Sequence, residues 1–167
     1  MRPVDDEKQK ELYSGKQKRH TKKNLITIQH TKRIEYLSPT VAGTVHDKKL
    51  ADQCDLEYPD DCTLLDDSGF IGYCPENVEI LRPFKKRKGS DLTLYQKTWN
   101  RIISSTRVGV EHVIRSMKRC RVVQDTIRLV IDGVEDLVME ICCGLHNFRL
   151  RVDPWPLLPE PGEFKWV

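Results

Sequence analysis

The sequence predicts a mixed α/β domain in which short strands come first and long helices come last. Residues 25–29 and 33–38 alternate in polarity and are rich in β-branched side chains, as strands are. From residue 92 to residue 117, apolar residues instead recur with the 3.6-residue period of a helix. A chain of 167 residues of which 38% are hydrophobic suits one domain, or part of a larger one, with a small core.

The segments before residue 90 predict short elements separated by polar turns. In chain order we expect a hairpin (25–29 and 33–38, with the turn 30–32), a loop (39–44), a short helix (46–54) that Thr44 caps, an acidic loop (55–61), a buried strand (62–65) that ends at Asp66 and Asp67, a turn at Ser68 and Gly69, a strand (78–81) and a basic loop (83–89).

Two helical regions follow. Ser90 and Asp91 are expected to open the first, and a break is expected near residues 104–106, where two serines precede Gly109 and all three are weak helix formers. The second region runs from about Asp125 to Phe148. The segment 154–162 has four prolines and predicts an extended arm. The expected organisation is a polar leader (1–12), one domain (13–150) and a Pro-rich tail (151–167).

Charge is distributed in blocks along the chain, although the net charge is only +3. Residues 8–33 hold nine Lys and Arg against one acid, and residues 82–121 hold twelve against two. Residues 47–67 reverse the sign, with eight acids against two lysines. Two basic blocks in a nearly neutral chain indicate a surface that binds a polyanion, and a solvated charged face is the alternative.

Several classes of protein are disfavoured by the composition. No uncharged apolar stretch approaches the length that spans a membrane, and the N-terminus lacks the apolar region of a secretory signal. None of the six cysteines sits in a C-x-x-C pair, so a zinc ribbon lacks its usual spacing. We expect six reduced thiols in a cytoplasmic protein associated with the nucleoid, with no membrane partner.

Two carboxylates stand out as candidate metal ligands. Asp67 directly follows an apolar strand, at the edge where α/β sheets place ligands. Glu111 is the only acid between Asp91 and Asp125, and its spacing from Arg107 and Lys118 puts all three on one helix face. Magnesium prefers such hard oxygen ligands. The alternatives are an ordinary acidic turn at Asp67 and plain i, i+4 ion pairs at Glu111.

Four segments together resemble the DDE transposases of bacterial insertion sequences, in the group related to Harbinger-type elements. They are Y-S-G-K-Q-K-R-H-T-K-K-N (13–24), G-T-V-H-D-K-K-L (43–50), L-L-D-D-S-G-F-I-G-Y (64–73) and N-R-I-I-S-S-T-R-V-G-V-E-H-V-I-R-S-M-K-R (100–119). Residues 107–118 also fit the R-x3-E-x6-K pattern of that family. Ser104 replaces the tyrosine that some relatives carry three residues before the arginine.

The resemblance implies an RNase H-like mixed sheet flanked by helices, with a catalytic triad of two aspartates and one glutamate. By position, Asp67 is the second aspartate and Glu111 the glutamate, and both would bind Mg²⁺ or Mn²⁺. It further implies metal-dependent phosphodiester cleavage and strand transfer at element ends and at a DNA target. The residues expected to contact DNA are cationic: Lys16, Lys18, Arg19, Lys22, Lys23, Arg107, Arg115 and Lys118.

The first aspartate of the family lies in an Asp-Gly-Thr or Asp-Gly-Ser element, and the chain contains neither. We therefore expect the C-terminal part of a catalytic domain that lacks its first, central strand and is inactive alone. Its expected partners are DNA, an upstream transposase fragment and further copies of itself. A non-catalytic DNA-binding regulator and the remnant of a decayed mobile element are the alternatives. Asp47 is interpreted as a helix N-terminal acid rather than a catalytic residue.

Overall fold

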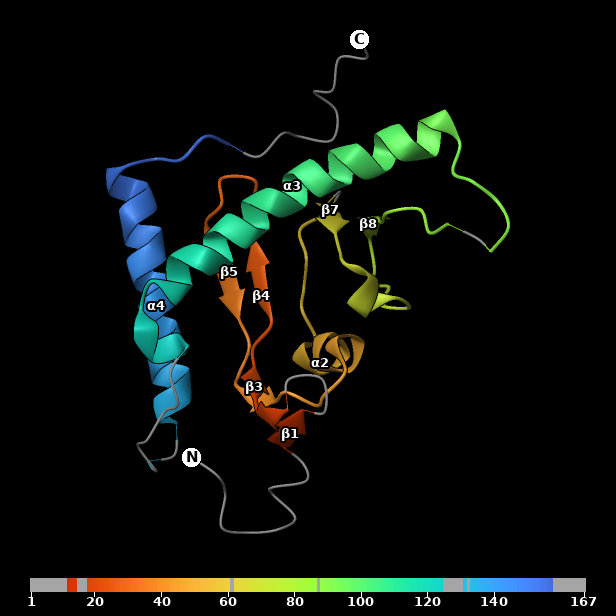
Figure 1. The fold of residues 1–167 in the computed structure, drawn as a ribbon. Coiled ribbons are helices and arrows are strands. Elements are labelled where there is room, and N and C mark those ends of the chain that lie inside the picture. The colour runs from red at the N-terminus through yellow and green to blue at the C-terminus, as the bar shows by residue number, and fades with distance from the viewer. Residues whose placement is uncertain are drawn as a thin grey trace. The chain divides into compact units, whose positions relative to one another are not determined.

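The structure is a computed structural model, and it describes residues 12–14, 18–60, 62–86, 88–124, 131 and 133–157. These residues form a mixed α/β fold of short strands and three α-helices (Figure 1). The chain divides into two compact units, residues 1–45 with 109–167 and residues 46–108. The predicted α/β class is confirmed. No helix within the described ranges is long and apolar enough to cross a membrane.

The described residues of the first unit form three antiparallel pairs of short strands. They are β1 (Tyr13–Ser14) with β2 (Arg19–His20), β3 (Lys22–Lys23) with β6 (Val41–Ala42), and β4 (Ile26–Ile28) with β5 (Ile34–Leu37). The β4–β5 pair is the predicted hairpin. The prediction of a loop over 39–44 was wrong, because β6 forms there by pairing with a distant strand, and such long-range pairing leaves little local signal.

Helix α4 (Val134–Val152) covers the β4–β5 hairpin in this unit (Figure 1). The small core of this unit consists of Ile34, Val113, Met117 and Cys143, with Trp155 packed against it. Trp155 also lies edge-on to the ring of the fully buried His146, with 5.5 Å between ring centroids. The described part of the Pro-rich tail is therefore held against the core at Trp155 and is not a free arm.

Polar side chains of α4 also fix it to the hairpin. Asn147 accepts a hydrogen bond from the backbone N–H of Ile34 and donates one to its carbonyl, both at 2.9 Å. The Nε2 atom of His146 lies 3.0 Å from the carbonyl oxygen of Lys32, and Asp136 accepts from the backbone N–H of Thr40 at 2.6 Å. Because α4 meets backbone groups rather than only side chains, its register against β5 is defined.

Replacing Asn147 by alanine is expected to cost about 2 kcal/mol, because it leaves the N–H and C=O of the buried Ile34 without partners. Asn100 makes the same double contact with the backbone of Phe84, but at an exposed position. Asn100→Ala is thus a matched control, and we expect it to cost less than about 1 kcal/mol. Urea unfolding of both variants measures the difference, and equal losses would contradict the interpretation.

The second unit contains the parallel pair β7 (Cys62–Leu65) and β8 (Val78–Leu81), with α2 (Asp47–Cys54) and the short 3₁₀ helix η1 (Ser68–Phe70). The sequence predicted β7, β8 and α2 at these positions. Strand β7 is only half-buried, however, rather than buried. The predicted cap of α2 at Thr44 was also wrong: the N-cap residue is His46, and its side chain makes no capping hydrogen bond.

Helix α3 (Leu94–Lys118) is continuous and runs from one unit into the other. It begins later than predicted, because Thr93 and Gln96 form a reciprocal capping box of 3.1 and 3.2 Å. The predicted break near residues 104–106 was wrong. The hydroxyl groups of Ser105 and Thr106 donate back to the carbonyl of Ile102, so these polar residues are accommodated within the helix.

The start of the second predicted helix also needs correction. After α3 comes the 3₁₀ helix η2 (Arg121–Val123), and α4 begins only after Gly133, which has a φ of 80°. That left-handed conformation favours glycine and separates α4 from what precedes it. Residues 125–130, part of the predicted helix, lie outside the described residues.

The six cysteines are free thiols, as predicted. Burial, followed by a hydrogen bond with Cys120, raises the pKa of Cys142 to about 11.

Candidate catalytic residues

Asp67 lies just beyond the end of β7, where a tight turn reverses the chain. The backbone N–H of Asp66 still bonds to the carbonyl of Leu81 on β8, at 3.4 Å. The carbonyl of Asp67 then accepts from the N–H of Phe70 at 3.0 Å, which closes the first turn of η1. The side chain of Asp67 is half exposed, at 50%. Asp67 thus occupies the edge predicted from the sequence, with its carboxylate accessible to solvent.

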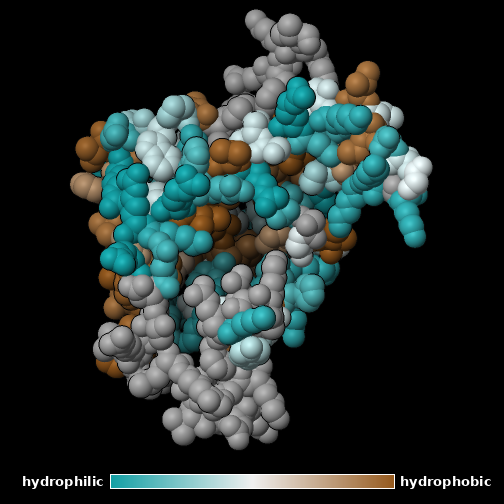
Figure 2. Space-filling view, viewed as in Figure 1, coloured by the Kyte–Doolittle hydropathy of each residue, from teal (hydrophilic) through white to brown (hydrophobic). Residues whose placement is uncertain are grey.

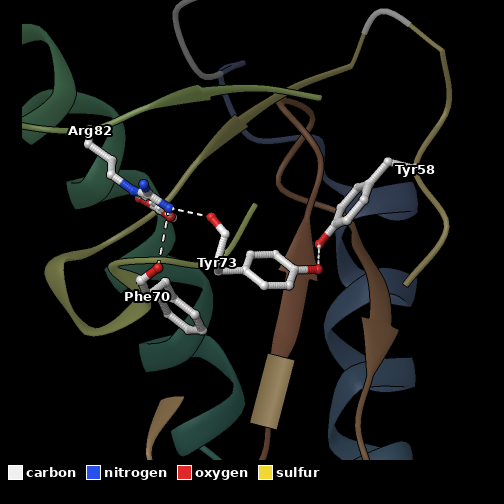
Figure 3. Close-up of polar contacts among 5 residues, drawn as sticks. Tyr58, Phe70, Tyr73 and Arg82 are labelled. Atoms are coloured by element: carbon white, nitrogen blue, oxygen red, sulfur yellow. Dashed lines mark hydrogen bonds and ion pairs between the residues drawn. The ribbon is translucent and has the colours of Figure 1, made fainter. Parts of the chain in front are cut away.

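The neighbouring Asp66 has a different role, because Arg82 binds it in a two-pronged ion pair. Nε and Nη2 of Arg82 lie 2.6 to 2.9 Å from the two carboxylate oxygens, and the Asp66 side chain is only 5% exposed. Nη2 also donates to the carbonyls of Phe70 and Tyr73, at 3.2 and 2.7 Å (Figure 3). The hydrogen bonds from Arg82 to Asp66 raise the arginine pKa. Asp66 therefore anchors the turn that presents Asp67.

Tyr73, whose carbonyl accepts from Arg82, also contacts a second tyrosine through its side chain. The hydroxyl oxygens of Tyr58 and Tyr73 lie 3.3 Å apart (Figure 3). Tyr73 is buried, and burial followed by this hydrogen bond raises the pKa of Tyr58. The turn from Asp66 to Tyr73, which contains Asp67, is thus held by contacts at both of its ends.

Arg107, a predicted DNA-binding residue, lies near Asp67 within the second unit. Its Nη1 atom is 3.5 Å from the Oδ1 atom of Asp67, and both side chains are about half exposed. A long ion pair between exposed groups contributes little stability. A cation that reached the half-exposed Asp67 carboxylate would therefore have little ion-pair energy to overcome at Arg107, and the guanidinium lies where a phosphate oxygen could bind beside that cation.

Glu111 follows Arg107 by one turn of α3. Both side chains are exposed, as are Arg115 and Lys118, and the spacing of these four residues places them along one face of the continuous helix. Glu111 belongs to the first unit and Asp67 to the second. The prediction that the two carboxylates share one cation stays a prediction. Within the described ranges, no three His, Cys, Asp or Glu side chains gather into a metal-binding group.

Asp47 has a position that the sequence reasoning missed. It lies in the first turn of α2, as predicted, but its carboxylate also approaches the turn after Asp67. A Cβ atom added to Gly69 would lie 2.6 Å from the Oδ2 atom of Asp47, which is closer than two such atoms can approach. Only glycine therefore fits at position 69 unless Asp47 moves.

The basic residues of the N-terminal block lie in different surroundings. Lys18 is exposed, whereas Lys22 forms an ion pair with Glu135 of α4 that lowers the pKa of this glutamate. Lys23 is half-buried on β3. Lys16 lies outside the described residues, and the side chain of Arg19 does as well. The predicted contacts of these residues with DNA stay predictions, and Lys22 would have to leave its carboxylate to make one.

The carboxylate of Asp67 has the chemistry that suits a hard divalent cation. Carboxylate oxygens are the preferred ligands of Mg²⁺, which also retains several waters. The half-exposed side chain of Asp67 leaves room for those waters, whereas the buried Asp66 has its oxygens occupied by Arg82. Of the two adjacent aspartates, Asp67 is therefore the one suited to bind metal.

Comparison with known proteins identifies the family. Residues 1–147 match the family described as DDE superfamily endonuclease. A probable transposase for insertion sequence element IS702 from Microchaete diplosiphon is 31% identical over 145 residues, which is 86% of this chain and 52% of that protein. The chain thus spans about half the length of this curated relative. No solved structure matches the chain. The match over most of its length shows that the chain belongs to the DDE superfamily endonucleases.

Proposed function

We propose that this chain supplies Asp67 and Glu111 as two of the metal-binding carboxylates of a transposase that cuts and joins DNA. The contrast between two adjacent aspartates carries the proposal: Arg82 holds the buried carboxylate of Asp66 in an ion pair, whereas Asp67 is half exposed beside Arg107. A carboxylate that is fixed in position and exposed to solvent is what a metal-dependent nuclease needs. Membership of the endonuclease family supports the same assignment.

In the intact enzyme, Asp67 and Glu111 would hold Mg²⁺ or Mn²⁺ through their carboxylate oxygens. When bound, the cations activate the attacking oxygen and stabilise the leaving oxygen of a phosphodiester. Arg107 and Lys118 would bind phosphate oxygens near the cut and so orient the strand. Asp66 and Arg82 would act through Asp67, because their ion pair fixes the turn that carries it.

The proposal includes a third carboxylate from outside these 167 residues, since the Asp-Gly-Thr or Asp-Gly-Ser element of the family does not occur among them. The test compares the chain alone with the chain joined to the coding region upstream of it, on supercoiled DNA with magnesium. We expect nicking by the joined protein and none by the chain alone. Nicking by the chain alone would show that all three carboxylates are already present, and no nicking by either form would favour a non-catalytic role.

DNA binding by the chain alone is expected to be largely independent of sequence and to weaken steeply with salt, because neutralising phosphates releases counterions. Arg115→Gln and Lys118→Gln should each reduce the slope of log affinity against log salt by about 1. Lys49→Gln, an exposed lysine in the acidic segment, is the control and should leave the slope unchanged. Fluorescence anisotropy between low and moderate salt measures the slope, and a flat dependence would contradict DNA binding through these residues.

A further inference from the structure

Helix α4 is apolar on the side that faces solvent as well as on the side that faces the core. Its inner side carries Met139 and Cys143, which contact the core cluster. Its outer side carries five large apolar residues that are 44% to 70% exposed: Leu137, Ile141, Leu145, Phe148 and Val152. We call these five residues the outer stripe. Hydrophobic side chains follow α4 along the left edge of Figure 2. A helix that is hydrophobic on both sides is normally buried on both sides.

The spacing of the outer stripe is that of a helix-pairing surface. Successive members are four, four, three and four residues apart, so they lie in one line along the helix. The line runs along most of the 19 residues of α4, a helix of about 28 Å at the usual rise per residue. A contiguous exposed apolar surface of this kind marks an interaction site. Its narrow, straight form matches a single helix.

Four of the five members of the outer stripe are placed symmetrically about a midpoint between Gly144 and Leu145. Leu137 and Val152 lie equally far from that midpoint, and so do Ile141 and Phe148. Two such helices in antiparallel orientation would bring each of these residues opposite the other member of its pair. The same apolar surface would then serve both partners, as a two-fold symmetric interface requires.

Gly144 supplies a second, independent observation. It is exposed, and a Cβ added there would meet no atom within 4 Å. None of the residues that the structure describes therefore requires a glycine at this position, although glycine in the middle of a helix is destabilising. At the midpoint of an antiparallel pair, Gly144 would lie next to its symmetry mate. A missing side chain at that place allows two helix backbones to approach closely, and this accounts for a glycine in the middle of the helix.

We propose that α4 pairs in antiparallel orientation with α4 of a second copy of this chain, through the outer stripe. The charges beside the stripe favour this orientation. Glu140 and Arg151 lie on the same flank of the stripe, toward opposite ends of the helix, so antiparallel pairing brings each glutamate near the arginine of the other copy. Parallel pairing would instead bring Arg149 near Arg151 of the other copy, where like charges repel.

The experiment measures the mass of the full 167-residue chain over a range of concentrations by sedimentation equilibrium. An interface of one helix per copy is at the small end of specific interfaces, so we expect a monomer–dimer equilibrium in the micromolar range. Ile141→Glu should raise the dissociation constant about 100-fold, because it places an unpaired carboxylate in the apolar contact. Leu94→Glu is the control: Leu94 is 83% exposed and lies on α3, outside the stripe, so the dimer should persist.

Charge reversal tests the orientation without altering the apolar contact. Glu140→Arg should weaken the dimer, and adding Arg151→Glu should restore it. A chain that stays monomeric at every concentration would overturn the proposal, as expected if the stripe binds a segment of a longer protein instead. A dimer that Ile141→Glu leaves unchanged would also overturn it. Circular dichroism would check that each variant is folded. If Ile141→Glu does not fold, the charge-reversal pair Glu140→Arg and Arg151→Glu still tests the proposal.

Discussion

Replacing Arg82 by alanine is expected to lower the free energy of unfolding by about 3 to 5 kcal/mol. The substitution leaves the carboxylate of Asp66, which is 5% exposed, buried without its counterion. It also removes the donor that bridges the carbonyls of Phe70 and Tyr73 across the turn. Removal of one partner of a buried ion pair costs more than the pair itself contributes, because the remaining charge has lost its solvent and its partner.

The size of this loss can be separated from the general effect of removing a positive charge. Lys86 forms an ion pair with Asp91 in which both side chains are largely exposed, so Lys86→Ala should change stability by less than about 1 kcal/mol. Arg82→Lys should recover part of the loss, since lysine keeps the charge but lacks the planar fork that binds both carboxylate oxygens. Guanidinium unfolding of the three variants measures the order. A loss for Arg82→Ala no larger than for Lys86→Ala would contradict the role of the pair.

Local sequence patterns predicted most elements of the fold but not their long-range pairing. The alternation of residues 25–29 and 33–38 identified β4 and β5, and the short helix predicted at residues 46–54 corresponds to α2. Strand β6 was missed because it consists of Val41 and Ala42 alone and depends on pairing with β3. The predicted break in α3 failed for a related reason: propensity penalises Ser105 and Thr106, but their hydroxyl groups find a carbonyl one turn back.

At the candidate site, the sequence identified Asp67, Glu111 and Arg107, and the structure brings Arg107 to Asp67. The position of Asp67 directly after a predicted strand distinguished it from most other acidic residues. That position could not reveal that Arg82, 16 residues after Asp66, binds Asp66 while Asp67 stays half exposed. The approach of Asp47 to Gly69 was equally hidden, because a contact between two segments of a turn and a helix depends on packing and not on spacing.

The apolar outer side of α4 shows how one sequence feature can be read in two ways. A helix with hydrophobic residues all round is normally buried on every side. The structure shows that only one side, with Cys143 and His146, is buried. The other side remains exposed in a single copy, so the pattern indicated a second contact that the fold of one chain does not supply.

Asp67→Asn and Glu111→Gln are each expected to reduce metal-dependent DNA cleavage about 1,000-fold or more in the chain joined to its upstream region. Each substitution removes a negatively charged oxygen ligand while keeping the size of the side chain. Loss of about 4 kcal/mol of stabilisation of the transition state corresponds to a factor of this size. Both side chains are exposed, so stability should change by less than about 0.5 kcal/mol, and DNA binding without metal should not weaken.

The matched control is Glu79→Gln, which removes an exposed carboxylate from β8 in the same unit as Asp67 and should leave the cleavage rate unchanged. Combining Asp67→Asn with Glu111→Gln should cost little more than either change alone, because residues that act as one catalytic unit are not additive. Two carboxylates with separate roles would instead multiply their losses. Time courses of supercoiled plasmid nicking at several magnesium concentrations measure each rate, and a Glu111→Gln rate within about 10-fold of the unmodified protein would remove Glu111 from the set of metal ligands.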